Sequence, residues 1–214
     1  GKVTPRSIFL LCGSVINPRR RIQSPDLLDC FVRFYLTRPD PTELHTEAIF
    51  KLLELCYDSG HVPDKRFLDL FCDVLIKDID SLSGLRTISA AFMLCCYNNI
   101  NKSLVTAIFS NEFMSRLDNE MDMSSNRRHY PKMLRRALMV LNRAVVLRNP
   151  EYGVPWFHSK YENKDFLRNP NCIEVTALKD EVNEHLSSLL GGWRYFRENT
   201  FSKYYNSIDF EVQF

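Results

Sequence analysis

A block of basic residues without any acidic residue between them is the feature of this sequence that most clearly indicates a binding site. Residues 123–150 contain seven arginines and lysines and no aspartate or glutamate, while the rest of the chain has 21 basic and 26 acidic residues. A positive block on an otherwise mildly acidic chain predicts an anionic partner at a definite place, and a nucleic acid is such a partner. The alternative is a solvated face that pairs with acids of neighbouring helices. The candidate phosphate-binding residues are Arg127, Arg128, Lys132, Arg135, Arg136 and Arg143.

A loop rich in aromatic residues follows this block, where Pro150, Gly153 and Pro155 interrupt the helical pattern. Its rings could stack on unpaired bases, each stack contributing about 1–3 kcal/mol. Alternatively, they could wedge the helical part of the chain against the C-terminal part, which is the interpretation we favour. The residues of this aromatic loop are Tyr152, Trp156, Phe157 and His158.

Most familiar catalytic patterns are missing from the sequence. It has no glycine-rich phosphate loop, no kinase H-R-D or D-F-G, no G-x-S-x-G and no H-E-x-x-H. The seven cysteines form no C-x-x-C pair, so we expect reduced, mostly buried thiols, no metal and no cofactor. The longest apolar run, residues 88–97, is too short for a membrane span.

The elements that must position these residues are mainly helices. Apolar residues recur at helical spacing in segments that begin near residues 25, 41, 63, 83 and 102. Pairs of helices at this rhythm are typical of an α-solenoid, although a compact helical bundle would show a similar rhythm. A longer helix is predicted over about 130–149, and its apolar stripe comprises Leu134, Ala137, Leu138, Leu141 and Val145.

The C-terminal segment changes character. We predict a helix over 174–190, a strand over 193–199 and a strand over 207–214, where apolar and polar residues alternate strictly. A hairpin of this size needs further strands or a packing partner, so we expect an incomplete α/β part in a chain excised from a longer protein. The predicted fold is mainly α. It has a helical-hairpin, α-solenoid-like array over 1–150, a linker with the aromatic loop over 151–171, and a small α/β part with a C-terminal β-hairpin over 172–214.

Several short stretches together resemble the two conserved regions of the FAST-kinase-domain proteins, the first over about 65–150 and the second over 172–214. For the first region the stretches are 107–109 (AIF), 112–113 (EF), 116–118 (RLD), 141–145 (LNRAV) and 149–152 (NPEY). For the second region they are 189–192 (LLGG), 195–196 (YF) and 208–211 (IDFE).

The resemblance implies an RNA-binding regulator of transcript processing and stability in the mitochondrial matrix. Its partner would be single-stranded mitochondrial RNA, bound by the basic residues above, and other RNA-processing proteins are further candidate partners. Kinase activity finds no support in these residues.

The resemblance also implies that a RAP domain, related to PD-(D/E)xK nucleases, follows beyond this chain. In nuclease-like folds of that kind, a strand of the form hydrophobic-Asp-Phe carries a metal-ligating aspartate, and Asp209 matches that position. The partner E-x-K-type strand is absent from this chain, so we assign no catalytic residue and expect no cleavage by it. Two alternatives to RNA binding remain: the supporting part of a nuclease completed downstream, and a protein–protein scaffold.

Overall fold

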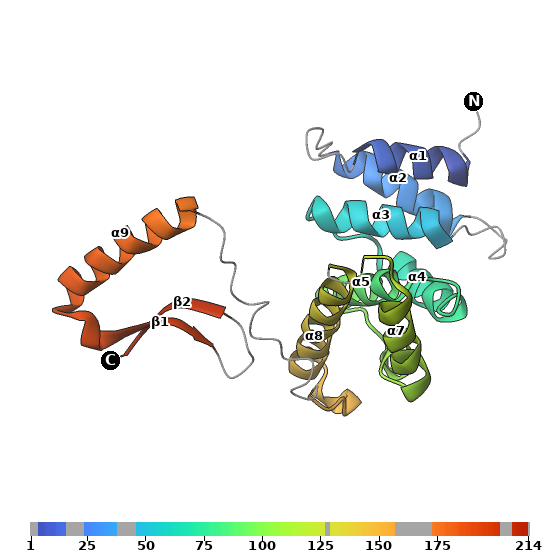
Figure 1. Ribbon diagram of the computed structural model, residues 1–214. Helices are drawn as coiled ribbons and strands as arrows, with labels where there is room; N and C mark the ends of the chain where they lie inside the picture. The colour runs from blue at the N-terminus through green and yellow to red at the C-terminus, as the bar shows by residue number, and fades with distance from the viewer. Residues whose placement is uncertain are drawn as a thin grey trace. The chain divides into compact units, whose positions relative to one another are not determined.

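The structure, a computed structural model, describes residues 4–15, 24–37, 46–126, 129–156, 173–201 and 207–213. The chain divides into two compact units, Gly1–Phe157 and His158–Phe214 (Figure 1). We call them the helical unit and the hairpin unit, and each is described by itself.

The helices of the helical unit alternate between two layers. In chain order they are α1 (Pro5–Val15), α2 (Pro25–Leu36), α3 (Thr46–Asp58), α4 (Lys65–Lys77), α5 (Gly84–Cys96), α6 (Lys102–Ile108), α7 (Asn111–Met123) and α8 (Tyr130–Arg148), followed by the 3-10 turn η2 (Pro150–Tyr152). Contacts run from α1 to α3, α5 and α8 in one layer and from α2 to α4 and α6 in the other, while α7 packs on α5, α6 and α8. The predicted mainly helical fold is confirmed, and the alternation is that of stacked helical hairpins (Figure 1).

The structure corrects two details of the predicted helices. It contains α1, which the periodicity analysis missed, and it divides the segment predicted from residue 102 into α6 and α7. The division occurs because the Ser110 hydroxyl accepts a hydrogen bond from the Phe113 amide at 3.2 Å, which starts a new helix. The start predicted near residue 41 lies outside the described residues, and the described part of that helix begins at Thr46.

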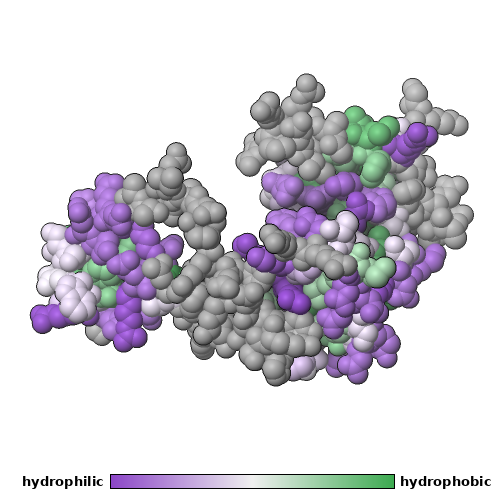
Figure 2. All heavy atoms as spheres, viewed as in Figure 1, coloured by the Kyte–Doolittle hydropathy of each residue, from purple (hydrophilic) through white to green (hydrophobic). Residues whose placement is uncertain are grey.

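The α5 helix is the most enclosed element of the helical unit, since it contacts α3, α4, α6, α7 and α8. Its side chains Ile88, Ala90, Ala91, Leu94 and Cys95 are fully buried. The small alanines allow neighbouring helices to approach closely. On the outside, polar side chains cover much of the visible surface, with hydrophobic ones between them (Figure 2).

Side chains from neighbouring helices hold both ends of α5. At its N-terminus, Glu120 accepts hydrogen bonds from the Gly84 amide at 2.8 Å and from the Tyr130 hydroxyl. At its C-terminus, Arg148 donates to the carbonyls of Cys95 and Cys96 at 2.9 and 3.2 Å. An acid at the first turn and a cation at the last turn complement the helix dipole, so both contacts favour this arrangement.

The hairpin unit contains α9 (Ile173–Leu190), the 3-10 turn η5 (Trp193–Tyr195) and the antiparallel strands β1 (Phe196–Phe201) and β2 (Ser207–Val212). The first strand therefore begins three residues later than predicted, because the chain turns through η5 after Gly191 and Gly192, which both have positive φ. The predicted alternation of β2 is confirmed: Ile208, Phe210 and Val212 are half-buried, whereas the residues between them are exposed.

The α9 helix packs on the β1–β2 hairpin through its polar side chains. Asn183 donates to the Glu198 carboxylate at 2.6 Å, and the Lys179 ammonium lies 5.6 Å from the centre of the Phe210 ring. Phe210 in turn meets Phe196 edge-to-face, with ring centres 6.1 Å apart. These contacts supply the packing partner that a two-stranded sheet requires.

Gly84 offers a test of the packing between α5 and α7. A Cβ atom built at this position would collide with the Leu117 side chain. We expect Gly84→Ala to lower the free energy of unfolding by about 1–3 kcal/mol, as overpacking of a core does, measured by urea denaturation. In a Leu117→Ala background the same substitution should lower the free energy of unfolding much less. An equal loss in the two backgrounds would contradict the contact between Gly84 and Leu117.

The cysteines in the described part of the chain differ in exposure. Cys12, Cys56, Cys72 and Cys95 are buried, Cys96 is half-buried and Cys30 is exposed, all as free thiols. Burial raises the pKa of Cys12, Cys72 and Cys95 to about 11 and that of Cys56 to about 12. The buried thiols are therefore protonated well above neutral pH, and the seventh cysteine, Cys172, lies outside the described residues.

Thiol labelling should separate these groups. Because the thiolate is the reactive form, the four buried cysteines should react slowly at pH 8 and rapidly only in denaturant, whereas Cys30 should react at once. A Cys30→Ser variant should lose the corresponding fast phase in a disulfide-exchange assay. If that variant keeps the same number of fast thiols, the assignment of Cys30 as exposed is wrong.

Candidate nucleic-acid interface

The α8 helix carries most of the predicted basic residues. Its buried stripe comprises Leu134, Leu138, Leu141 and Val145, as predicted, although Ala137 is only partly buried. By helical spacing, Lys132, Arg136 and Arg143 fall on the opposite face. Lys132 and Arg136 are exposed, and Arg143 is half-buried. Arg127 and Arg128 lie outside the described residues.

Arg136 differs from the other cations nearby. Among the described residues it forms no hydrogen bond or ion pair, whereas Lys132 and Arg143 have polar or electrostatic partners. The helix dipole gives no reason for its position, because a cation in the first two turns of a helix lies near the positive end. The first turn of α8 contains no acidic residue, and its N-cap, His129, makes no side-chain cap. Arg136 is therefore available to an external anion.

Arg135 does not match the expectation from the sequence. A phosphate-binding side chain must reach solvent, but Arg135 is half-buried, and its Nε atom is buried without a hydrogen-bond partner among the described residues. The reason is its position on the helix, about 100° from Arg136 and therefore towards the buried stripe. Arg135 is thus a poor choice for a charge-reversal experiment.

Arg148 belongs to the same basic block but has a structural role. Besides the two carbonyls at the end of α5, its guanidinium donates to the Asn98 side chain at 3.3 Å. It fixes the C-terminus of α8 to the C-terminus of α5, so it has a structural role within the helical unit.

The segment after α8 is anchored on the helical unit. Asn142, only 2% exposed, donates to the Pro155 carbonyl at 2.9 Å, and the Tyr152 hydroxyl donates to the Ile100 carbonyl at 3.0 Å. Tyr152 also packs against the core, so its ring is not free to stack on a base. Trp156 is 45% exposed, while Phe157 and His158 lie outside the described residues.

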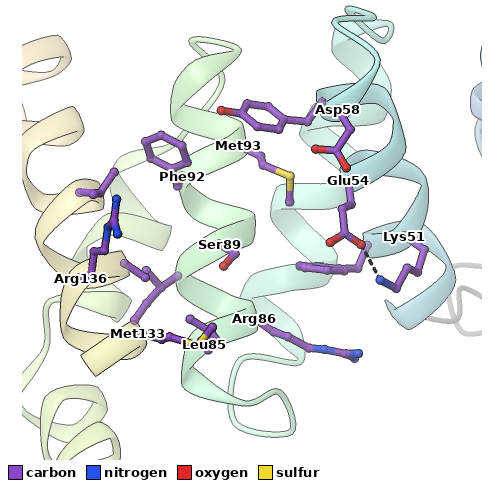
Figure 3. Close-up of a pocket in the computed structure, with 15 residues that line it drawn as sticks. Lys51, Glu54, Asp58, Leu85, Arg86, Ser89, Phe92, Met93, Met133 and Arg136 are labelled. Carbon is purple, nitrogen blue, oxygen red and sulfur yellow. Dashed lines mark hydrogen bonds and ion pairs between the residues drawn. The ribbon is translucent and has the colours of Figure 1, made fainter. Parts of the chain in front are cut away.

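A groove of about 630 Å³ lies next to Arg136, lined by α3, α5 and α8. Figure 3 shows Arg136 and Met133 on the α8 side, Lys51, Glu54 and Asp58 on the α3 side, and α5 between them. Sequence analysis identified Arg136 but not the groove, because its lining comes from three helices that are separated in sequence. The helical period of each helix is visible in the sequence, but the period does not say which faces meet.

Asp209 lies in β2 and is exposed, on the strand face opposite Phe210. Within the described residues, no group of three or more His, Cys, Asp or Glu side chains comes together in a way that could hold a metal ion. The nuclease-related role of Asp209 therefore remains a prediction from the resemblance.

The chain matches known proteins along most of its length. The family model described as "FAST kinase-like protein, subdomain 2" matches residues 135–214. "FAST kinase domain-containing protein 1, mitochondrial" of Xenopus laevis is 26% identical over 203 residues, 94% of this chain and 22% of that protein. The protein of the same name from Xenopus tropicalis is 28% identical over 176 residues, 80% of this chain and 20% of that protein. The mouse protein of that name is 30% identical over 120 residues, 56% of this chain and 14% of that protein.

The chain is similar to FAST-kinase-domain proteins, and the model of their second subdomain matches residues 135–214. It spans about a fifth of the length of the Xenopus relatives. The match to subdomain 2 begins at Arg135 within α8 and continues through the hairpin unit, so it includes Arg136 and Arg143.

No solved structure matches the chain significantly. In the described part of the chain, no helix combines the length and apolar character that crossing a bilayer requires.

The anchoring of Tyr152 can be tested directly. Tyr152→Phe keeps the packed ring and removes the hydrogen bond to Ile100, so it should lower the free energy of unfolding by about 0.5–1.5 kcal/mol. The substitution should leave RNA affinity unchanged, because the ring already packs on the core. Chemical denaturation and an RNA titration of the same variant measure both quantities. Reduced RNA affinity without any loss of stability would instead place Tyr152 at the RNA.

Proposed function

We propose that this chain is the RNA-binding module of a mitochondrial post-transcriptional regulator that acts on transcript processing or stability in the matrix. The exposed face of α8 binds the phosphates of single-stranded RNA, with Arg136 as the principal contact and Lys132 as a second contact. Arg143 lies on the same face of α8, and Arg127 and Arg128, which precede α8 in the sequence, are further candidate contacts.

The observation that carries this proposal is the guanidinium of Arg136, unpaired among the described residues, on a helix without acidic residues. Two cations that line the groove next to Arg136 have partners: Arg86 pairs with Glu47, and Lys51 with Glu54 at 2.5 Å. An ion pair inside the protein weakens the attraction for phosphate, whereas an unpaired cation neutralises phosphate and releases its counterions. Residues 123–150 contain no acid, so α8 itself contributes no negative charge that would repel RNA.

The relatives support the cellular setting of the proposal. Their names place them in the mitochondrion, and the resemblance of this chain to FAST-kinase-domain proteins implies regulation of organellar RNA. The matched segment includes most of α8, so the proposed surface lies inside the region that this chain shares with the family.

Charge reversal on α8 tests the proposal. Single-strand binding falls with a slope of about −0.7 in log affinity against log salt for each phosphate neutralised, and four or five contacts predict about −3. Lys132→Glu combined with Arg136→Glu should weaken binding to all sequences alike and reduce that slope by about 1.4 in magnitude. A salt-dependent fluorescence-anisotropy titration with a single-stranded oligonucleotide measures both effects.

The matched control reverses the charge of two exposed lysines in the first turns of other helices, as Lys65→Glu combined with Lys102→Glu. The control has the same net charge as the α8 double variant, so it should keep most of the affinity and the slope. If the two double variants lose affinity equally, the effect belongs to net charge and the α8 face is only a solvated surface.

A further inference from the structure

The groove beside Arg136 has chemically different sides. Its floor is α5, where Ser89, Phe92 and Met93 lie along the groove, and its α8 side presents Met133 and Arg136 (Figure 3). The α3 side presents the Lys51–Glu54 ion pair and Asp58. A molecule that fits this groove must combine apolar faces with a negative end near α8 and hydrogen-bond donors near α3.

The groove also offers an exposed aromatic edge. Tyr57 of α3 is 38% exposed and meets Phe92 of α5 edge-to-face, with ring centres 6.3 Å apart. The two rings support each other, and both line the groove. Supported rings beside a groove are platforms on which a flat base can stack.

We propose that this groove accepts one unpaired base of single-stranded RNA, whose backbone phosphate is bound by Arg136. This inference rests on the proposed RNA-binding function and assigns the place where a base is read. The ring of the base packs on the apolar floor and the Phe92 edge. Its polar edge faces α3, where the carboxylate oxygens of Glu54 and Asp58 accept hydrogen bonds.

The charges favour a nucleotide over an apolar helix of another protein. A helix docked by its apolar face would bury the unpaired Arg136 guanidinium and the charged groups of α3, which is costly unless each finds a partner. A nucleotide satisfies both sides, because it carries its negative charge at one end and hydrogen-bonding groups at the other. A groove of about 630 Å³ also lies within the usual size range of small-ligand sites.

The same arrangement predicts a preference among bases. Carboxylates only accept hydrogen bonds, and adenine, cytosine and guanine each present an exocyclic amino group with two N–H donors, whereas the polar edge of uracil offers a single ring N–H between two carbonyls that carboxylates repel. Glu54 keeps acceptor capacity although it pairs with Lys51, because a carboxylate has two oxygens. The groove should therefore prefer bases with an amino group over uracil.

Filling the groove tests the inference. Ser89→Trp on the floor should lower the affinity of the 214-residue chain for oligo(A) about fivefold or more, the loss of one stacked base, and leave the salt slope unchanged. An oligonucleotide with abasic sites should bind the parent and Ser89→Trp equally. Ser103→Trp, on the exposed face of α6, is the matched control and should bind like the parent.

Two further variants keep the test decisive if Ser89→Trp disturbs folding, which thermal melting would show. Phe92→Leu retains an apolar side chain without the ring and should also weaken oligo(A) binding. Glu54→Gln combined with Asp58→Asn should reduce the preference of oligo(A) over oligo(U), because each amide keeps one acceptor oxygen but replaces the other with a donor.

The outcomes distinguish this inference from the function on which it rests. If the parent binds RNA with the expected salt slope but the groove variants bind equally well, the base site is wrong and the α8 phosphate surface stands. Such a result would leave the groove as a protein-docking surface. If the parent shows no salt-dependent RNA binding, the proposed function itself is wrong.

Discussion

The packing of α8 along α5 is the constraint on which the candidate interface depends. The α5 helix is fixed at its first turn by Glu120 and at its last turn by Arg148, the final residue of α8. Because its two ends are held by α7 and α8, α5 cannot slide without breaking a hydrogen bond to a carboxylate or a guanidinium. Hydrogen bonds to charged groups contribute about 1.5–3 kcal/mol each. The position of α8 relative to α5 is therefore defined by directional contacts as well as by hydrophobic burial.

The position of α8 then decides which cations face outwards. Its buried stripe from Leu134 to Val145 leaves no rotational freedom, since turning the helix would expose leucines. Lys132 and Arg136 consequently lie opposite the core, and Arg136 also borders the groove over α5. The groove and the basic face thus have one common cause, the docking of a single amphipathic helix.

Sequence patterns predicted those features of the fold that arise within a single helix or strand. The period of 3.6 residues identified α8 within a residue at each end, and the alternation after residue 206 identified β2. The break at Ser110 and the η5 turn after Gly192 were missed, because each depends on a local hydrogen bond or backbone conformation rather than on periodicity. The groove was missed for another reason: residues 50–58, 85–93 and 133–140 meet only through tertiary packing.

Counting charges in a sequence overstates the surface that is free to bind an anion. In this chain Arg148 donates hydrogen bonds to carbonyls, and Arg86 pairs with Glu47. Arg116 donates to the Ile79 carbonyl at 2.8 Å, and its guanidinium lies over the Phe113 ring. Each of these guanidiniums has a contact within the fold, and the ion pair with Glu47 also offsets the charge of Arg86.

The cations near the start of α8 have the opposite effect. A positive charge close to a helix N-terminus costs about 0.3–1 kcal/mol, and no acid on the helix offsets that cost. A bound phosphate would remove the repulsion, so ligand binding and the stability of α8 are linked. The same residues that make α8 slightly unfavourable in isolation are those that give it affinity for an anion.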